Sequence, residues 1–411
     1  MTEKMRITGD HWFGLLGKLV VALCLLPMIA VAIAAPSGGF DTIVSLSQSV
    51  LPRYVGATLQ LSVIVGLGTA VIGTGAAWLV TMTRFFGRRV LEIALALPLA
   101  FPAYVLAYAY TDLLDHPGLV QSTLRAFMGW GPRDYWFPEI RSLGGAAAML
   151  VLVLYPYVYL LARAAFLRQS ATAYIAARTL GQGPWGAFWR VSLPVARPAI
   201  AGGVLLALME TLADYGTTAY FGVQTFATGI YVSWFGLFDR AAAAQLALCL
   251  LVVALTLATF ERRQRRHSRH HDAGRRFEVM EPVTLNSRAA LGAILFCGLP
   301  VLFGFVLPVW ILITLAADQA HILFTDRYLG FLRHSLTLAA IAAFLTVGAA
   351  IALGFRARLR PTPMSKTALR VAGIGYAVPG GVIAVGLLFP FAAFDNALDH
   401  FMETNFGIDT G

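Results

Sequence analysis

The sequence predicts an all-α fold, a polytopic transmembrane helix bundle in which about nine spans are present. Of the 411 residues, 58% are apolar and only 13% are charged, and the mean hydropathy of +0.72 is above that of soluble globular domains. Apolar runs long enough to cross a bilayer recur along the whole chain. The net charge of +10 is divided among short loops, which is typical of a membrane protein and argues against nucleic-acid binding.

The first apolar run, residues 19–35, follows a basic stretch and predicts a transmembrane helix whose N-terminus is cytoplasmic. Ala32-Ile33-Ala34 also resembles a signal-peptidase site, so a cleaved signal peptide is the alternative. The run is longer than the apolar region of a typical signal peptide, and similar runs follow it. A retained helix is therefore the favoured interpretation.

Further apolar runs, separated by loops rich in charge or in turn residues, predict eight more spans. They cover residues 55–82, 91–114, 144–167, 199–218, 241–260, 289–315, 335–355 and 371–394. Basic residues follow the even-numbered spans, whereas the tail from residue 395 has acids and no Lys or Arg. This alternation supports a cytoplasmic N-terminus. Pro98 and Pro102 lie inside the third span, where we expect them to kink the helix.

The chain also contains an internal repeat with an offset of 277 residues. Thr58-Leu59-Gln60-Leu61 aligns with Ser335-Leu336-Thr337-Leu338, and Pro102 aligns with Pro379. We therefore expect two parallel six-span repeats, twelve spans in all. Residues 1–260 are predicted to form the first half, with a cytoplasmic loop at 170–199, and residues 289–411 the start of a second, C-terminally incomplete half. A degenerate second half is the alternative.

Residues 261–288, between the halves, are rich in arginine and histidine. We interpret them as a basic cytoplasmic linker rather than a histidine metal site, because they show no ordered periodicity. Cys24, Cys249 and Cys297 lie inside apolar spans, with a spacing that suits neither a metal site nor a disulfide framework. The sequence contains no phosphate-binding Gly-x4-Gly-Lys-Ser/Thr loop. We expect no catalytic residue, no metal site and no bound cofactor.

The loop at 170–199 is the most informative stretch. Residues 173–180 favour a short helix, Gly181 and Gly183 would end it, and Pro184 suits the first position of a second helix. On that helix Trp185, Phe188 and Trp189 share one face. A partner with a hydrophobic groove would cover this face. The alternative is that the loop packs against its own bundle or lies on lipid.

The spacing of this loop resembles the EAA loop of ABC-importer permeases. Ala176, Ala177, Gly181, Leu193 and Pro194 match that pattern, whereas Ile175 stands where the family has glutamate. The resemblance implies that the loop docks on an ATP-binding subunit and couples its ATP-driven closure to the membrane gates. The interface it predicts consists of Ala176, Ala177, Gly181, Trp185, Phe188, Leu193 and Pro194.

Three longer blocks, residues 97–105, 210–226 and 378–386, look like the fused two-half permeases of ferric-iron importers. That resemblance implies a multi-pass protein of the bacterial cytoplasmic (inner) membrane. A periplasmic substrate-binding protein would deliver ferric iron, and a homodimeric ATP-binding subunit would bind the ATP. Related permeases carry thiamine, phosphonate, sulfate or polyamines, and these are alternative solutes.

Glu210 and Asp214 are two carboxylates inside the predicted fifth span. Four residues apart, they are expected on one helical face, turned to the bundle interior or to a watery cavity. With Tyr215, Pro102 and Pro379 they form the predicted translocation path; the alternative is a role in capping or in pairing with an arginine. An ion-coupled secondary transporter using this pair is the rival function, but it has no need of an exposed aromatic cytoplasmic loop.

Overall fold

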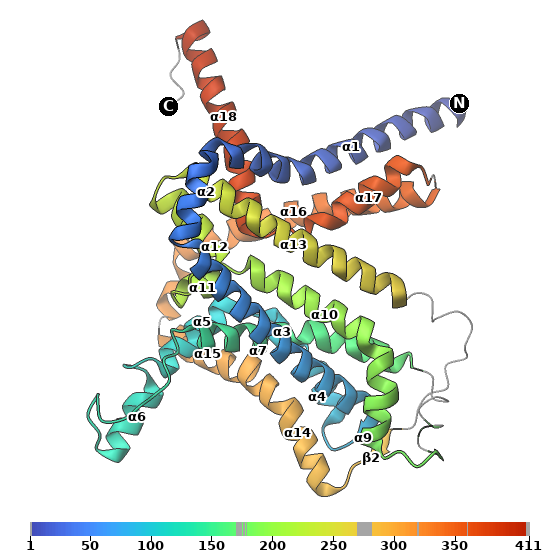
Figure 1. Ribbon diagram of the computed structural model, residues 1–411, viewed down its shortest axis with the longest axis vertical. Coiled ribbons are helices and arrows are strands. Elements are labelled where there is room, and N and C mark those ends of the chain that lie inside the picture. Colours follow the sequence, from blue (N-terminus) through green and yellow to red (C-terminus); the bar gives the residue numbers. More distant parts are fainter. Residues whose placement is uncertain are drawn as a thin grey trace. The chain divides into compact units, whose positions relative to one another are not determined.

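The computed structural model describes residues 2–169, 175, 177, 179–268, 282–318, 320–359 and 361–407. It confirms the predicted all-α class, because the described chain is almost wholly helical (Figure 1). Two strands of two residues each, β1 (Thr83–Arg84) and β2 (Val283–Thr284), pair in parallel. In the described part, eight helices are long and apolar enough to cross a membrane, or nine if one bent pair counts as a span.

The helices follow the predicted spans closely in the middle of each span and less closely at the ends. In chain order they are α1 (Thr2–Ala34), α2 (Gly39–Gln48), α3 (Leu51–Met82), α4 (Arg88–Ala94), α5 (Ala103–Leu114), α6 (Leu119–Met128), α7 (Leu143–Leu167), α9 (Pro184–Ala187), α10 (Leu193–Ala213), α11 (Gly216–Tyr220), α12 (Phe226–Tyr231), α13 (Arg240–Ser268), α14 (Ser287–Val301), α15 (Leu307–Asp318), α16 (Asp326–Leu359), α17 (Pro363–Gly375) and α18 (Gly380–Phe406). Shorter 3₁₀ segments are η1 (Ala35–Gly38), η2 (Leu97–Ala100) and η7 (Ala320–Phe324), and π turns are η3 (Phe188–Ser192), η4 (Val232–Gly236) and η6 (Leu302–Val306).

The third predicted span is broken rather than merely kinked. The helical stretches on either side of residues 101–102 are bent by 93°. Pro102 has extended backbone, with ψ of 135°, and α5 begins at the next residue. A proline donates no N–H and disfavours helical backbone in the residue before it, so the helix stops and a new one starts in another direction.

The chain divides into two compact units, of which the larger comprises Ser49–Gly229 and Thr256–Ile313. Its core is formed where α3, α7 and α10 pack together. Glycines allow the close approach: a Cβ added to Gly73 of α3 would lie 2.7 Å from the Cβ of Val158, and one added to Gly203 of α10 would lie 2.6 Å from its Cα. Small residues at helix crossings are what lets membrane helices gain van der Waals contact.

The seventh span also belongs to this unit. Its first part, α14, packs on α3 and α4, and its π turn η6 packs on α7 and η2. A Cβ on Gly304 would lie 3.0 Å from the Leu152 carbonyl oxygen, and Tyr110 donates a 2.7 Å hydrogen bond to the Phe303 carbonyl. The first span of the second predicted half is thus packed against helices of the first half.

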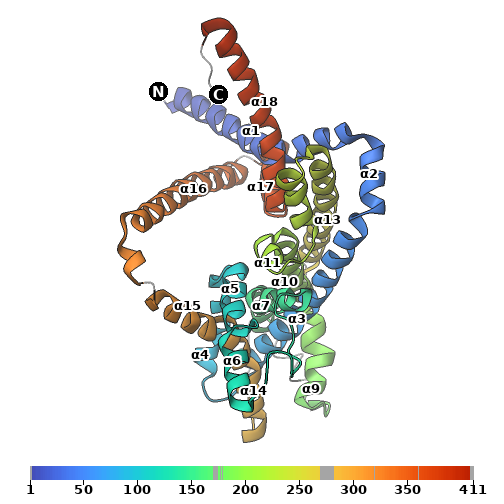
Figure 2. The same ribbon diagram turned by 90° about the vertical axis from the view of Figure 1, so that its left-hand side faces the viewer.

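The other unit comprises Met1–Gln48, Ile230–Leu255 and Thr314–Gly411, and it shows the reciprocal arrangement. Here α1 packs on α16, α17 and α18 (Figure 2). The crossing point is close, because a Cβ on Gly386 would lie 2.6 Å from the Cα of Pro27. Position 304 lies 277 residues after position 27, the predicted repeat offset. Each half therefore packs its first span against the other half's helices.

The repeat also appears at the broken spans. Pro379 precedes α18 as Pro102 precedes α5, with ψ of 143° and 135° respectively. Some boundaries differ from the prediction. Helix α2 lies between the first two predicted spans, and α18 continues to Phe406, beyond the predicted end of its span at residue 394. In both places the helix extends beyond the apolar run. Hydropathy predicts which residues lie in the membrane, and it does not predict where the backbone hydrogen bonds of the helix end.

Candidate functional site

The first part of the loop at 170–199 ends as its glycine predicts. Gly181 has φ of +85°, in the left-handed region, and the Gln182 N–H donates a 3.0 Å hydrogen bond to the Ala177 carbonyl. This six-residue closure around a left-handed glycine is the common end of a helix. Ala177 is buried, whereas Ala176 and Arg178 lie outside the described residues.

The second part begins at Pro184, also as predicted, and does not end before the membrane span. Residues 184–213 form one continuous helical stretch through α9, η3 and α10, which places Leu193 and Pro194 within it. In the π turn η3, the Leu193 N–H bonds to the carbonyl of Phe188. Pro194 has no N–H to offer the Arg190 carbonyl, which favours this wider turn. The fifth span therefore ends at Ala213, earlier than the predicted 199–218.

The three aromatic residues of this segment lie side by side, as their spacing predicts, but they are not equally exposed. Phe188 is only 6% exposed, and its ring centroid lies 5.0 Å from Trp78 and 6.5 Å from Phe166. Trp185 and Trp189 are 63% and 60% exposed. The bundle itself therefore covers Phe188, which anchors the segment, and leaves the two tryptophans on the surface. We call residues 175–194 the coupling segment from here on.

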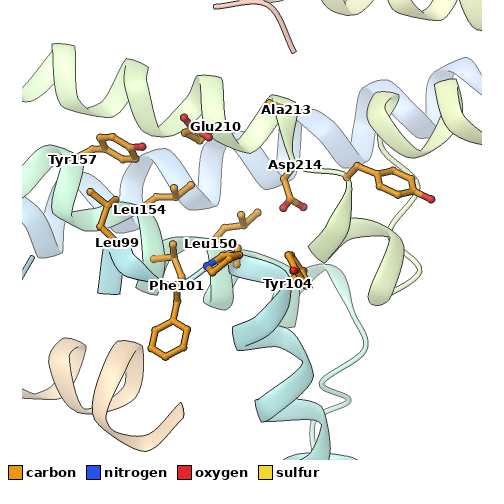
Figure 3. Close-up of a pocket in the computed structure, with 13 residues that line it drawn as sticks. Leu99, Phe101, Tyr104, Leu150, Leu154, Tyr157, Glu210, Ala213 and Asp214 are labelled. Atoms are coloured by element: carbon orange, nitrogen blue, oxygen red, sulfur yellow. The ribbon is translucent and has the colours of Figure 1, made fainter. Parts of the chain in front are cut away.

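A cavity of about 360 Å³ lies where the broken third span meets the end of α10 (Figure 3). It is lined by Leu99, Phe101, Pro102, Ala103, Tyr104, Leu150, Val153, Leu154, Tyr157, Glu210, Ala213, Asp214 and Tyr215. Four of the five predicted path residues, Pro102, Glu210, Asp214 and Tyr215, thus meet at one cavity. Pro379 lies in the other compact unit and is not among the lining residues.

Glu210 and Asp214 both line this cavity, as the prediction of a shared face turned to a cavity requires, but Asp214 lies just beyond the end of α10. Helix α10 ends at Ala213, and the backbone of Asp214 is extended, with ψ of 115°. Its carboxylate accepts hydrogen bonds from the Thr218 N–H at 3.0 Å and from the Thr217 hydroxyl at 2.9 Å. Asp214 therefore caps the short helix α11, as the capping alternative held. Glu210 stays on the last turn of α10, and both residues line the cavity.

This difference predicts separable effects for the two amide substitutions. Asp214→Asn keeps one acceptor oxygen but loses the charge and the second acceptor oxygen at the N-terminus of α11, so we expect a loss of about 0.5–1 kcal/mol in stability. Glu210→Gln leaves the cap intact and should alter solute uptake without lowering the melting temperature. Thermal unfolding in detergent and uptake into proteoliposomes measure the two effects. An unchanged melting temperature with lost uptake in Asp214→Asn would contradict the capping role.

The sequence interpretation missed one charged contact. Glu92 of α4 and Arg163 of α7 form an ion pair, and both side chains are partly buried. The Tyr159 hydroxyl donates a 2.6 Å hydrogen bond to the Glu92 carbonyl, which joins the same two helices. Glu92 and Arg163 are both charged residues inside predicted apolar spans. Because charged residues in a membrane span are rarely left without partners, the sequence could have indicated that they pair.

The described residues contain no group of three or more His, Cys, Asp and Glu side chains that could hold a metal ion. His270 and His271 of the predicted linker lie outside the described part. Cys297 is buried, and Cys24 and Cys249 are partly buried.

Residues 63–266 match the family model described as "Binding-protein-dependent transport system inner membrane component". The Fe(3+)-transport system permease protein FbpB 2 of Haemophilus influenzae is 25% identical over 388 residues, covering 92% of this chain and 71% of that protein. The molybdenum transport system permease protein ModB of Escherichia coli is 30% identical over 166 residues, covering 40% of this chain and 69% of that protein.

Solved structures agree on the fold. A chain from the crystal structure of a bacterial alginate ABC transporter, in complex with an alginate pentasaccharide-bound periplasmic protein, superposes with a TM-score of 0.52. It is 21% identical, and the match covers 65% of this chain and 98% of that one. Together with the helical bundle, these similarities show that the chain is a multi-span inner-membrane permease and belongs to the binding-protein-dependent ABC transport family.

Proposed function

We propose that this chain is the membrane-spanning subunit of an ATP-driven importer that takes up ferric iron delivered by a periplasmic binding protein. The importer class rests on the family to which the chain belongs. The solute is suggested by the ferric-iron permease relative, which matches 92% of the chain. The relatives named for molybdenum and sulfate transport make oxyanions the second candidate.

One structural observation carries the proposed mechanism. The continuous stretch from α9 to α10 spans 29 residues from Trp185 to Ala213, roughly 40 Å of helix. Its first two turns carry the exposed Trp185 and Trp189, and its last turn carries Glu210 at the cavity. A push on the tryptophans would therefore move the cavity wall through a single rigid element.

In this proposal the N-terminus and the coupling segment are cytoplasmic. A separate ATP-binding subunit, acting as a homodimer, covers Trp185 and Trp189 and supplies all ATP hydrolysis. Its closure shifts the coupling segment, and the cavity changes from an inward-facing to an outward-facing state that accepts the solute from the binding protein. Ala177 and Phe188 support the surface from beneath because both are buried.

Co-purification tests the docking surface. We expect an ATP-binding subunit to co-purify with the natural full-length permease, and Trp185→Ala with Trp189→Ala to reduce its recovery at least tenfold. Exposed aromatic anchors at interfaces commonly carry this much binding energy. Trp136→Ala is the matched control, because Trp136 is 85% exposed in the loop after α6 and should leave recovery unchanged.

Absence of any ATP-binding subunit from the wild-type sample would favour the secondary-transporter alternative, with Glu210 as a coupling group. If the subunit is present, uptake of ferric iron, molybdate and sulfate into proteoliposomes containing the complete system decides between the candidate solutes. Ferric iron transported no better than the oxyanions would contradict the proposed solute and leave the importer class intact.

A further inference from the structure

A second cavity, of about 400 Å³, lies beside the coupling segment and away from the path residues. Its walls come from the end of α3, from α9 and η3, from β2 and from the start of α14. The lining residues are Gly75, Trp78, Leu79, Met82, Thr83, Trp185, Phe188, Val283, Leu285, Ala289, Gly292, Ala293 and Phe296. None of them carries a charge, so the interior suits a hydrocarbon chain rather than an ion.

The cavity wall nevertheless contains one polar group in need of a partner. Trp78 is only 5% exposed, and its indole N–H has no acceptor among the residues that the structure describes. A buried donor left without a partner is costly, and an indole ring typically places its N–H toward a polar neighbour. Because this nitrogen is itself buried, the cavity is lined by the apolar part of the ring.

Positive charge adjoins the lining of the cavity along the chain. Arg84 follows the lining residue Thr83, and Arg288 precedes the lining residue Ala289. Both arginines are exposed. The pairing of β1 with β2, together with a 3.3 Å hydrogen bond from the Leu285 N–H to the Arg84 carbonyl, holds the two flanks together. Arginines beside a cavity between membrane helices are typical partners for an anionic lipid headgroup.

We propose that this cavity binds an anionic phospholipid from the leaflet on the side of the coupling segment. One acyl chain occupies the apolar interior against the Trp78 ring, and the phosphate pairs with Arg84 and Arg288. Because Trp185 and Phe188 form part of the wall, the lipid also steadies the coupling segment against α14. This last consequence rests on the proposed importer function, whereas lipid binding does not.

Native mass spectrometry of the natural full-length permease, purified in detergent and titrated with phosphatidylglycerol or phosphatidylcholine, tests the site. We expect wild type to retain phosphatidylglycerol at least tenfold more strongly than phosphatidylcholine. Gly292→Phe should lower phosphatidylglycerol retention at least tenfold, since an added Cβ there meets nothing within 4 Å and the ring can enter the cavity. Gly298→Phe is the matched control on the same helix, equally open and outside the lining.

A further double variant isolates the charged part of the site. Arg84→Ala with Arg288→Ala should abolish the preference for phosphatidylglycerol while leaving some lipid bound. Equal retention by wild type, Gly292→Phe and Gly298→Phe would overturn the proposal, as would a wild-type protein that retains neither lipid.

The outcome is independent of the co-purification experiment. Loss of lipid retention in Gly292→Phe with normal recovery of the ATP-binding subunit supports the lipid site whatever the transported solute is. Failure to recover any ATP-binding subunit would remove the importer mechanism without affecting lipid binding. A melting temperature for Gly292→Phe within a few degrees of the wild-type value shows that the lipid effect is not caused by unfolding.

Discussion

Valine in place of Gly181 should reduce solute uptake at least tenfold while leaving the assembled complex able to hydrolyse ATP. Gly181 has φ of +85°, and a β-branched residue in that left-handed region is strained by about 1–3 kcal/mol. The strain falls on the turn that is closed by the hydrogen bond from the Gln182 N–H to the Ala177 carbonyl. This turn sets the position of the following helix. We expect the coupling segment to dock and no longer to transmit the movement.

ATP hydrolysis and uptake, measured on the same proteoliposomes, would show this uncoupling directly. Gly183→Val is the matched control. An added Cβ at Gly183 meets nothing within 4 Å, and a residue before proline prefers the extended backbone that valine also favours. Gly181→Asn should fall between the two, because asparagine enters the left-handed region more readily than valine. Normal uptake by Gly181→Val would count against a role for this closure in coupling.

Alanine at both Gly73 and Gly203 should prevent recovery of a folded permease. Each added methyl group would press on the backbone of α7: at Gly73 it lies 2.8 Å from the Tyr155 carbonyl oxygen, and at Gly203 it lies 2.6 Å from the Cα of Val158. Overpacking against side chains costs about 1–3 kcal/mol, and backbone in the middle of a helix yields less. The summed loss of stability at the two sites approaches the total free energy of unfolding of a typical domain.

Size-exclusion profiles and melting temperatures in detergent measure this effect, with the single variants giving intermediate values. Gly202→Ala provides a sharp control, because it lies next to Gly203 on α10 and its added methyl group meets only the Leu161 Cδ1 atom, at 3.9 Å. Alanine there should be neutral or slightly stabilising, since alanine favours helix over glycine by about 1 kcal/mol. If Gly203→Ala melts no lower than Gly202→Ala, the close crossing of α7 and α10 does not limit stability.

Much of this molecule follows from short-range features of its sequence. The cores of α3 and α7 coincide with apolar runs, because burial of twenty apolar residues in lipid needs no distant partner. Gly181 and Pro184 mark the end and start of helices as expected, since left-handed backbone and a missing N–H are properties of single residues. The 277-residue repeat aligned Pro102 with Pro379, and each of these prolines directly precedes a helix, α5 and α18 respectively.

Tertiary structure alone decided which of the predicted features meet. Helical periodicity grouped Phe188 with Trp185 and Trp189, but only the position of Trp78 turned Phe188 inward. Spacing placed Glu210 and Asp214 on one face, and the actual end of α10 separated their roles. The reciprocal packing of α1 and α14, and the Glu92–Arg163 pair, join residues far apart in the chain. Local sequence sets which residues share a helix face, whereas the neighbour that covers that face is chosen by packing among all the helices.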